Sequence, residues 1–420
     1  MQREPIVFVG TSDLSGHFRG KSFPAADLPA RLGRGVGLAP TNIFLSAFGT
    51  IPVTSFGTLG EVALIPDPST RVFLPWEEGA SEHFYIGDLR TLAGIAWDFC
   101  PRHVLRRAIE RLQAETGLRM LATFEQEFIY SGVPATPRQP YQLEALRRQG
   151  IFGEALLAAL RQVGVIPDSF LSEYGAQQFE VTVAPALGIR AADDAVITRE
   201  VARAIATRLG QRVSFTPMPQ PDGTGSGTHI HFSFLDPDDQ PVLYAEDQPW
   251  QLAPLGRHFI AGVQYHLPAL CAVTAPSVPS YYRLRPDRWA PVRADVGNLD
   301  RGAALRICPV TAREEVQRAR QYNVEFRVAD AAASPYLALA MLLFAGLDGL
   351  QYKREIETAK APALPGSLGE ALTLLEANTA AAEWLGADLL KAYLLFKRAE
   401  IRELANLDEH EICRRYADAY

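Results

Sequence analysis

The sequence predicts an α+β protein in which a small β-rich domain, residues 1–95, is followed by a larger domain, residues 96–420. A chain of 420 residues is too long for one ordinary domain. The first ninety or so residues are rich in glycine, proline and short apolar runs. Turn signals such as Pro66-Asp67-Pro68 separate these runs, which is typical of strands. From Pro101 onward, apolar residues recur three and four positions apart, which is the period of a helix.

In chain order, the apolar runs of the first domain predict strands at residues 6–9, 43–48, 62–65, 72–74 and 83–86. Pro101 fits the first turn of a helix that Gly117 ends. Further helices are predicted at residues 143–163, 192–209, 254–273 and 335–348. The segment from Ser367 begins with a capping-box pattern, Ser-Leu-Gly-Glu, and is predicted to be helical almost to its end.

Composition narrows the class of protein. The formal net charge of −7 argues against a nucleic-acid binder, which would normally present a basic face. Four cysteines are scattered singly in apolar stretches, as buried thiols in a reducing compartment would be. The N-terminus lacks the apolar run of a signal peptide, and the most apolar segment, residues 336–350, is too short for a membrane span. We therefore expect a cytoplasmic protein that binds neither nucleic acid nor membrane.

Four short segments of the larger domain share one alternating pattern. They are residues 123–130, 178–183, 229–234 and 323–328, and in each a strand would point alternate side chains to opposite faces. One face of each strand is apolar. The other face is polar in all four, and it holds Glu125, Glu127, Gln178, Glu180, His229, His231, Ser233, Asn323, Glu325 and Arg327.

An antiparallel sheet with one wet side would show the same alternation. However, solvated faces usually contain lysine, and these faces contain none. Their four carboxylates and two imidazoles would repel one another unless a cation lay among them. Carboxylate oxygens with a histidine suit Mg²⁺ or Mn²⁺ better than a structural zinc. So many carboxylates could hold two such ions, which is the usual arrangement for phosphoryl transfer.

Two neighbouring features favour an anionic substrate. The glycine-rich turn Gly223–Gly227 leads into the strand with the two histidines, and such a turn lets backbone N–H groups approach a ligand closely. A plain flexible turn is the alternative. Six arginines and no lysine then crowd residues 281–306, and arginine binds carboxylates and phosphates bidentately. A solvated basic stretch is the alternative there. Together the residues indicate a site for metals, phosphates and an acidic substrate.

The same motifs, in this order and spacing, resemble the glutamine synthetase family over nearly the whole chain. They are Asp13-Leu-Ser-Gly-His-Phe-Arg-Gly-Lys, Pro66-Asp-Pro-Ser-Thr, Glu125-Gln-Glu-Phe, Glu173-Tyr-Gly-Ala-Gln-Gln-Phe-Glu, Gly225-Ser-Gly-Thr-His-Ile-His, Ser280-Tyr-Tyr-Arg-Leu, Asp300-Arg, and Asn323-Val-Glu-Phe-Arg. The resemblance implies a β-grasp-like N-terminal domain. It also implies a catalytic domain with an antiparallel half-barrel sheet flanked by helices.

The resemblance also implies roles for individual residues. One metal would be held by Glu127, Glu173 and Glu180, and the other by Glu125, His229 and Glu325. Positions that hold the glutamate substrate match Gly225, Arg283 and Arg327. Positions around ATP and the transferred phosphate match His231, Ser233, Arg301 and Arg306. The resemblance implies that the two arginines are also catalytic.

The implied reaction is an ATP-dependent carbon–nitrogen ligation with Mg²⁺ or Mn²⁺ as cofactor. The γ-carboxylate of glutamate attacks ATP, and an amine then attacks the γ-glutamyl phosphate. The family forms stacked hexameric rings with sites between subunits, so we expect a dodecamer. The loop near Asp13 would then serve the site of the next subunit.

Two departures from the family pattern concern the amine. Glutamine-forming members carry a glutamate in the flap after the glutamate-binding arginine, and counting from Arg283 that position is Trp289. Their ammonium-binding loop is only partly kept in Asp13-Leu-Ser-Gly16. An indole cannot take a proton from ammonium, but it offers a flat apolar wall to an organic amine. We therefore expect Trp289 to line an organic-amine pocket, and the proton to be taken by Asp13 or Glu173.

Two alternatives stay open at this point. One is a true glutamine synthetase with a rebuilt ammonium site. The other is a non-catalytic relative with a regulatory or assembly role, although such relatives typically lose metal ligands or phosphate-binding arginines, and this chain keeps both sets.

Overall fold

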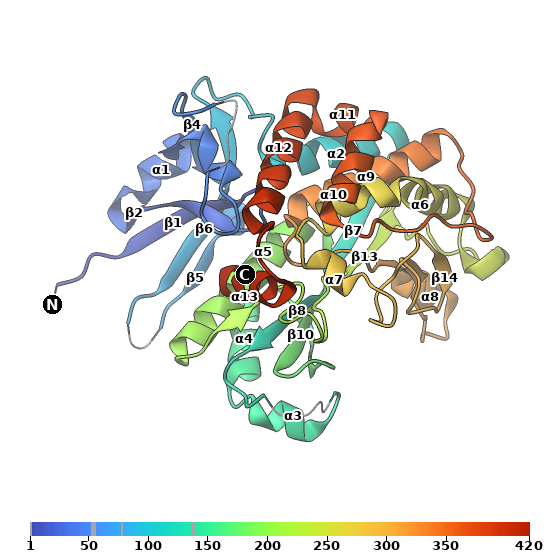
Figure 1. The fold of residues 1–420 in the computed structure, drawn as a ribbon, viewed down its shortest axis with the longest axis horizontal. Helices are drawn as coiled ribbons and strands as arrows, with labels where there is room; N and C mark the ends of the chain where they lie inside the picture. The colour runs from blue at the N-terminus through green and yellow to red at the C-terminus, as the bar shows by residue number, and fades with distance from the viewer. Residues whose placement is uncertain (1, 52–55, 77–78, 136–139) are drawn as a thin grey trace.

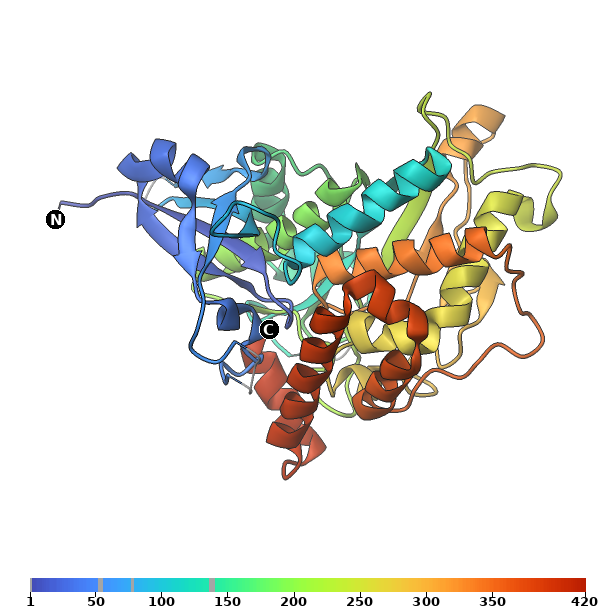
Figure 2. The same ribbon diagram turned by 90° about the horizontal axis from the view of Figure 1, so that it is seen from above.

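The computed structural model describes residues 2–51, 56–76, 79–135 and 140–420. Its N-terminal part is one mixed sheet, coloured blue at one end of the molecule in Figures 1 and 2. The strand order is β2-β1-β6-β4-β3, with β5 paired to β6, and β1 runs parallel to β6. The strands are β1 (Ile6–Ser12), β2 (Phe18–Pro24), β3 (Val36–Leu38), β4 (Val62–Pro66), β5 (Val72–Leu74) and β6 (Glu82–Thr91), and α1 (Leu28–Arg34) joins β2 to β3 through a short 3₁₀ turn.

The larger part contains two further sheets, and the chain passes from one to the other at Glu125. The first has the order β12-β8-β10-β9, with β8 (Gln126–Tyr130), β9 (Pro167–Ser172), β10 (Gln178–Val183) and β12 (Val213–Ser214). The second has the order β11-β7-β13-β16-β15-β14, with β7 (Arg119–Phe124), β11 (Ala186–Leu187), β13 (Ile230–Leu235), β14 (Val296–Asn298), β15 (Leu305–Ile307) and β16 (Val324–Phe326). All pairs in these two sheets are antiparallel except β14 with β15.

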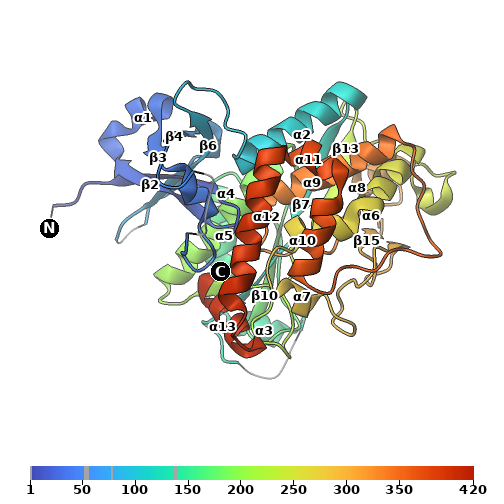
Figure 3. The same cartoon turned by 45° about the horizontal axis from the view of Figure 1, so that its top comes forward.

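Helices cover these sheets. The apolar helix α9 (Pro335–Gln351) is buried on nearly every side and packs against α2 (Pro101–Thr116) and α6 (Pro254–Thr274), as expected of a helix without a polar face. Figure 2 shows α9 in orange beside the cyan α2. The C-terminal helices α10 (Leu368–Ala377), α11 (Thr379–Leu385), α12 (Ala387–Leu404) and α13 (Glu409–Ala419) lie along one side of the large domain in Figure 3. The remaining helices are α3 (Leu143–Arg148), α4 (Phe152–Gln162), α5 (Ile189–Arg208), α7 (Ser280–Arg283) and α8 (Glu315–Gln321).

The predicted α+β class, with a small N-terminal β domain and a large domain of sheets and helices, is confirmed. Three predicted elements were wrong in detail. The predicted helix 143–163 is two helices, because Gly150 adopts a left-handed φ of 65° between α3 and α4. The predicted strand 43–48 is not a strand: Pro40 begins a 3₁₀ helix, Pro40–Phe44, that buries Ile43 and Phe44. The predicted strand 123–130 is divided at Glu125 between two sheets.

A buried arginine joins the N-terminal sheet to the helices behind it. The Arg102 side chain, on α2, donates to both carboxylate oxygens of Asp193 on α5, at 3.0 and 2.9 Å. It also donates to Asp88 on β6 at 2.9 Å and to Asp67 at 2.8 Å. Arg102 is 0 % exposed, so its charge depends on these carboxylates. We call this group the Arg102 cluster.

The helices differ from membrane-spanning segments in length or in apolar composition. Within the described residues, none of them combines the length and the apolar composition that crossing a bilayer requires.

Candidate active site

Two cavities meet at a group of carboxylates between the sheets of the large domain. The first cavity, of about 590 Å³, is lined by residues from both sheets and from the loop after α7. The second cavity, of about 540 Å³, is lined by β7, β9, β10, β13 and the segment after β15. Glu125 and Glu180 line both cavities. A ligand in one cavity would therefore meet a ligand in the other at these two carboxylates.

Most residues selected from the sequence lie around the first cavity. They are Glu125, Glu127, Glu173, Glu180, Gly225, His229, Arg283, Trp289, Arg301, Arg306, Glu325 and Arg327. His231 and Ser233 line the second cavity instead. This division separates the residues expected to hold glutamate and the amine from two of those expected to hold ATP.

Glu127 and Glu180 face each other directly across β8 and β10. Like charges at opposed positions destabilise a sheet. Burial raises the pKa of Glu127 to about 7, and the neighbouring Glu173 adds to this shift. Burial, followed by the charges of Glu125 and Glu127, raises the pKa of Glu180 to about 10. Burial likewise raises the pKa of Glu173. Without a cation, Glu127 and Glu180 are therefore held partly as neutral acids.

A second group centres on Glu125 and Glu325. His229 Nδ1 lies 3.0 Å from Glu125 Oε2 and 3.3 Å from Glu325 Oε1, and the donor atoms of these three residues all lie within 4.8 Å of one another. Burial acts to raise the pKa of Glu125, but hydrogen bonds from His229 and His231 outweigh burial and hold that pKa well below its usual value. Burial also acts to raise the pKa of Glu325, but the charges of His229 and Arg327 outweigh burial and lower that pKa.

The second group has the spacing of a divalent-cation site, and the carboxylates of the first group have the chemistry of one. Glu125, His229 and Glu325 already converge on one point, and the repulsion among Glu127, Glu173 and Glu180 is the kind that a bound cation relieves. Oxygen donors with one imidazole are the ligands of Mg²⁺ and Mn²⁺ sites.

The metal-free protein is expected to lose stability as the pH rises from about 6 to 9. The pKa values of Glu127 and Glu180, about 7 and about 10, lie above the ordinary 4.5, so the folded state binds more protons than the unfolded state in this range. The stabilisation is complete below pH 4.5 and is lost as the pH passes through the folded pKa values. Between pH 6 and 9 the titration covers about one pKa unit for Glu127 and about three for Glu180, so at about 1.4 kcal/mol per unit the loss is roughly 5–6 kcal/mol.

Thermal unfolding at pH 6 and pH 9 checks this, with EDTA and with saturating Mg²⁺. Mg²⁺ favours the ionised carboxylates, so it should flatten the pH dependence, and Glu180→Gln should flatten it without metal. Equal slopes with and without Mg²⁺ would contradict the metal assignment.

Buried arginines line the same cavity. Arg306 Nη1 donates to Glu325 Oε2 at 2.8 Å, and Arg327 pairs with Glu325 Oε1. Arg283 donates to the backbone carbonyls of Val328 and Ala329. Within the described part of the chain, the buried Nε atoms of Arg283, Arg306 and Arg327 have no hydrogen-bond partner. Three such donors beside one cavity suit carboxylate or phosphate oxygens.

The glycine-rich turn is held close to these groups. A Cβ atom at Gly225 would lie 2.5 Å from the Arg283 side chain, and one at Gly227 would lie 2.9 Å from His229. Gly227 N–H donates to Glu127 Oε2 at 3.0 Å, and Arg288 donates to the Gly223 carbonyl at 2.7 Å. The glycines therefore allow the turn to approach the cavity more closely than any other residue could.

Three aromatic rings form a wall beside Glu173. The Trp289 ring lies 5.5 Å from the Tyr174 ring, and the Tyr174 ring lies 5.7 Å from the Tyr141 ring. The Tyr141 hydroxyl donates to Glu173 Oε1 at 3.0 Å. Trp289 is 72 % exposed and lines the first cavity, so its ring is open to a ligand there. We call these three rings the aromatic wall.

Asp13 lies outside both cavities of its own subunit, and its expected role as a proton acceptor at the site of the next subunit stays a prediction. Its side chain is fully buried. One carboxylate oxygen accepts from the Ser15 and His17 backbone N–H groups at 2.9 Å each, and the other pairs with Arg19. These contacts make the carboxylate a structural group that holds its own loop.

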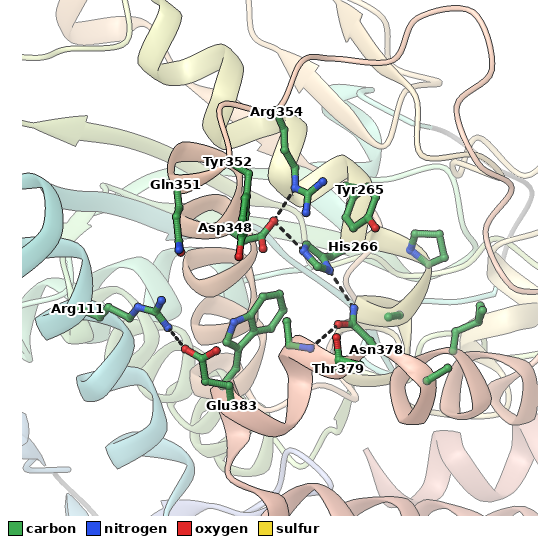
Figure 4. Close-up of a pocket in the computed structure, with 16 residues that line it drawn as sticks. Arg111, Tyr265, His266, Asp348, Gln351, Tyr352, Arg354, Asn378, Thr379 and Glu383 are labelled. Atoms are coloured by element: carbon green, nitrogen blue, oxygen red, sulfur yellow. Dashed lines mark hydrogen bonds and ion pairs between the residues drawn. The ribbon is translucent and has the colours of Figure 1, made fainter.

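A third cavity, of about 660 Å³, lies among α2, α6, α9, α10 and α11, and the described residues that line it differ from those of the other two. Figure 4 shows His266 between Asp348 and Asn378. The His266 Nε2 atom lies 3.0 Å from Asp348, and Asn378 donates to Nδ1 at 2.9 Å. Asp348 also pairs with Arg354. The charges are paired within the cavity wall, so this network stabilises the packing of the helices.

Comparison with known proteins identifies the family. Residues 2–97 match the family model for the glutamine synthetase N-terminal domain, and residues 98–416 match the model for the glutamine synthetase catalytic domain. The chain therefore belongs to the glutamine synthetase family, and its catalytic domain is that of an ATP-dependent carbon–nitrogen ligase. Family members use divalent metals together with ATP.

Individual relatives cover nearly the full length. The chain is 33 % identical over 441 residues to the gamma-glutamylpolyamine synthetase of Streptomyces coelicolor, covering 99 % of this chain and 93 % of that protein. It is 30 % identical over 429 residues to the glutamine synthetase of Pyrococcus woesei, covering 94 % and 89 %. A solved structure described as a novel glutamine synthase homolog matches with a TM-score of 0.95 and 40 % identity, covering 100 % and 99 %.

Sequence reasoning missed several residues of the site. Tyr174 lies inside the recognised Glu173-Tyr-Gly motif, so its ring could have been considered. Tyr141 lies in a loop without a motif, and only the fold brings it to Glu173. Cys308, which contacts His231 and Glu325, was regarded only as a buried thiol.

Proposed function

We propose that this enzyme joins the γ-carboxylate of glutamate to an organic amine, through a γ-glutamyl phosphate intermediate formed with ATP. The observation that carries the proposal is the aromatic wall, in which Trp289 occupies the flap beside the acidic cavity. Aromatic faces attract cations and pack against carbon substituents, whereas bare ammonium gains little from such a wall. The relative named as a gamma-glutamylpolyamine synthetase agrees with an amine that has a carbon chain.

The metals in this proposal are Mg²⁺ or Mn²⁺, two per site. Glu127, Glu173 and Glu180 would hold one, and Glu125, His229 and Glu325 the other. When bound, the two ions neutralise the phosphate oxygens of ATP during phosphoryl transfer.

The remaining roles follow from the positions of the arginines and histidines. Arg283 and Arg327, with the close approach at Gly225, would bind the carboxylates of glutamate through their unpaired Nε–H groups. Arg306 and the exposed Arg301 would stabilise the charge on the transferred phosphate. His231 and Ser233 would contact ATP in the second cavity.

Proton removal from the amine is assigned to Glu173. This carboxyl lines the first cavity at the foot of the aromatic wall, beside the position that the amine would take. Tyr141 and the Tyr174 backbone N–H hold the two carboxylate oxygens in place. Asp13 lies outside this cavity, so within one subunit Glu173 is the candidate that stands beside the aromatic wall.

Assembly and location belong to the same proposal. We infer a dodecamer of two hexameric rings, which the size of the particle in solution would test, and a cytoplasmic enzyme. All four cysteines are free and buried, which suits a reducing compartment.

The test compares kcat/KM for ammonium and for a panel of organic amines, with ADP release measured in the presence of Mg²⁺, ATP and glutamate. The wild type is expected to prefer an organic amine. Trp289→Glu should reduce that preference about 10-fold, since a cation–π contact is worth roughly 1–2 kcal/mol. Trp289→Phe, which keeps an aromatic face, is the matched control and should retain most of the preference.

The outcomes separate the three functions considered. A wild type that favours ammonium would make the protein a true glutamine synthetase. A protein that binds ATP but releases no ADP with any amine would be a non-catalytic relative.

A further inference from the structure

A cysteine thiol lies in contact with two residues of the site. Cys308 follows β15, and its backbone N–H donates to the Asn323 carbonyl at 3.1 Å, which places the thiol beside β16. Its Sγ atom lies 3.6 Å from His231 Nδ1 and 4.0 Å from Glu325 Oε2. The thiol, the imidazole and the carboxylate each offer a donor atom, and these atoms all lie within 4.8 Å of one another.

The spacing fits a tetrahedral metal ion. With Zn–N of about 2.0 Å and Zn–S of about 2.3 Å, a tetrahedral site places nitrogen and sulfur roughly 3.6 Å apart. The distance from Cys308 Sγ to His231 Nδ1 already has this value. Sulfur and carboxylate oxygen should also be roughly 3.6 Å apart, so the pair at 4.0 Å would need to close by only a few tenths of an ångström.

The surroundings of His231 support metal binding at Nδ1. Its Nε2 atom lies 3.0 Å from Glu125 Oε1, so that carboxylate lies behind the ring, and Nδ1–H donates to Asn323 Oδ1 until a bound ion replaces that proton. A carboxylate behind a metal-binding histidine fixes the ring in this way in many metal sites. Asn323 Oδ1 lies 2.9 Å from Nδ1 and provides a nearby oxygen as a fourth donor.

We propose that His231, Cys308 and Glu325 form a separate cation site that binds thiophilic divalent ions such as Zn²⁺. The Cys308 thiol proton, and any proton on His231 Nδ1, pass to solvent when the ion binds. Soft thiolate selects Zn²⁺ over Mg²⁺, which prefers an all-oxygen shell. The site at Cys308 therefore binds a different class of cation from the carboxylate sites, which suit Mg²⁺ or Mn²⁺.

Binding there would interfere with ligation, and this consequence rests on the proposed function. Glu325 Oε2, the oxygen nearest Cys308, also accepts from Arg306 at 2.8 Å. An ion on this oxygen would draw Glu325 from the Mg²⁺ set and weaken its contact with Arg306. It would also occupy His231, which faces the second cavity. We therefore expect Zn²⁺ to inhibit the enzyme.

Binding is tested independently of catalysis with Co²⁺ as a spectroscopic substitute for Zn²⁺. The wild-type protein should develop a thiolate-to-cobalt charge-transfer absorption that Zn²⁺ displaces and Mg²⁺ does not. Cys308→Ala should abolish this absorption. Cys413→Ala, which removes another buried free thiol, on α13, should retain it. An absorption that persists in Cys308→Ala, or no absorption in the wild type, would overturn the site.

Inhibition is then measured as the Zn²⁺ concentration that halves each variant's own Mg²⁺-supported rate. This concentration should rise at least about 10-fold in Cys308→Ala, since loss of a metal ligand or its support typically costs 10–100-fold in affinity. Equal inhibition of wild type and Cys308→Ala would place zinc in the carboxylate sites and overturn the inhibitory role. If the protein had no ligase activity, the cobalt experiment would still decide whether the cation binds.

Discussion

Replacing Glu325 with glutamine is expected to abolish turnover, with kcat falling by about 10³-fold or more. Glu325 is 1 % exposed and is shared by three groups. His229 Nδ1 lies 3.3 Å from Oε1, Arg327 pairs with the same oxygen, and Arg306 donates to Oε2. Glutamine keeps the size of the side chain but removes the charge. It would therefore remove a proposed metal ligand and leave two buried guanidinium groups without their carboxylate.

ADP release at saturating ATP and glutamate measures the effect, and thermal unfolding shows whether the variant is folded. Glu154→Gln is the matched control, because Glu154 is exposed on α4 and lies outside the lining of both cavities. Near-normal ADP formation by Glu325→Gln at modest Mg²⁺ would contradict the two-metal assignment. A folded but inactive variant would support it.

Replacing Arg102 with methionine is expected to destabilise the protein by about 3–5 kcal/mol. The Arg102 cluster compensates three carboxylates with one guanidinium, and Asp193 also accepts from the Tyr336 hydroxyl at 2.6 Å. Methionine fills part of the space but leaves the buried charge of Asp193 without a cation. Because Asp67 and Asp88 belong to the N-terminal part and Asp193 to α5, the substitution also removes one of the polar contacts between the N-terminal part and the large domain.

Unfolding by urea measures this change in free energy. Arg398→Met is the control, because Arg398 pairs with Glu376 at an exposed position, where such a pair contributes about 0–1 kcal/mol. If Arg102→Met lowered the free energy of unfolding by less than about 1 kcal/mol, the ion pairs of Arg102 would not be what mainly offsets the cost of burying its charge.

The sequence determined much of the fold because the signals involved are local. Pro101 and Gly117 bound α2, and the predicted cap of α10 is present as a 3.1 Å hydrogen bond from Glu370 N–H to Ser367 Oγ. Alternation with a period of two placed four carboxylates and two histidines on the polar faces of their strands, and the structure gathers them around adjoining cavities. Each of these inferences needs only residues that are neighbours in the chain.

What the sequence alone could not determine depends on contacts between distant segments. Alternation did not reveal that the chain changes sheets at Glu125, because a strand pattern contains no information about its pairing partner. Asp13 was selected through the family resemblance, and only packing shows that its side chain is buried and pairs with Arg19.

The aromatic wall and the Cys308 contacts are likewise tertiary. Trp289 was selected for its place in the flap, but only the structure shows that Tyr174 lies against it and that Tyr141 lies against Tyr174. From the sequence Cys308 is an ordinary buried thiol, and only the pairing of β16 with both β13 and β15 brings it to His231. Local periodicity fixes which way a side chain points along its own strand. Only the packing of strands and loops that are remote in sequence decides which groups it meets there.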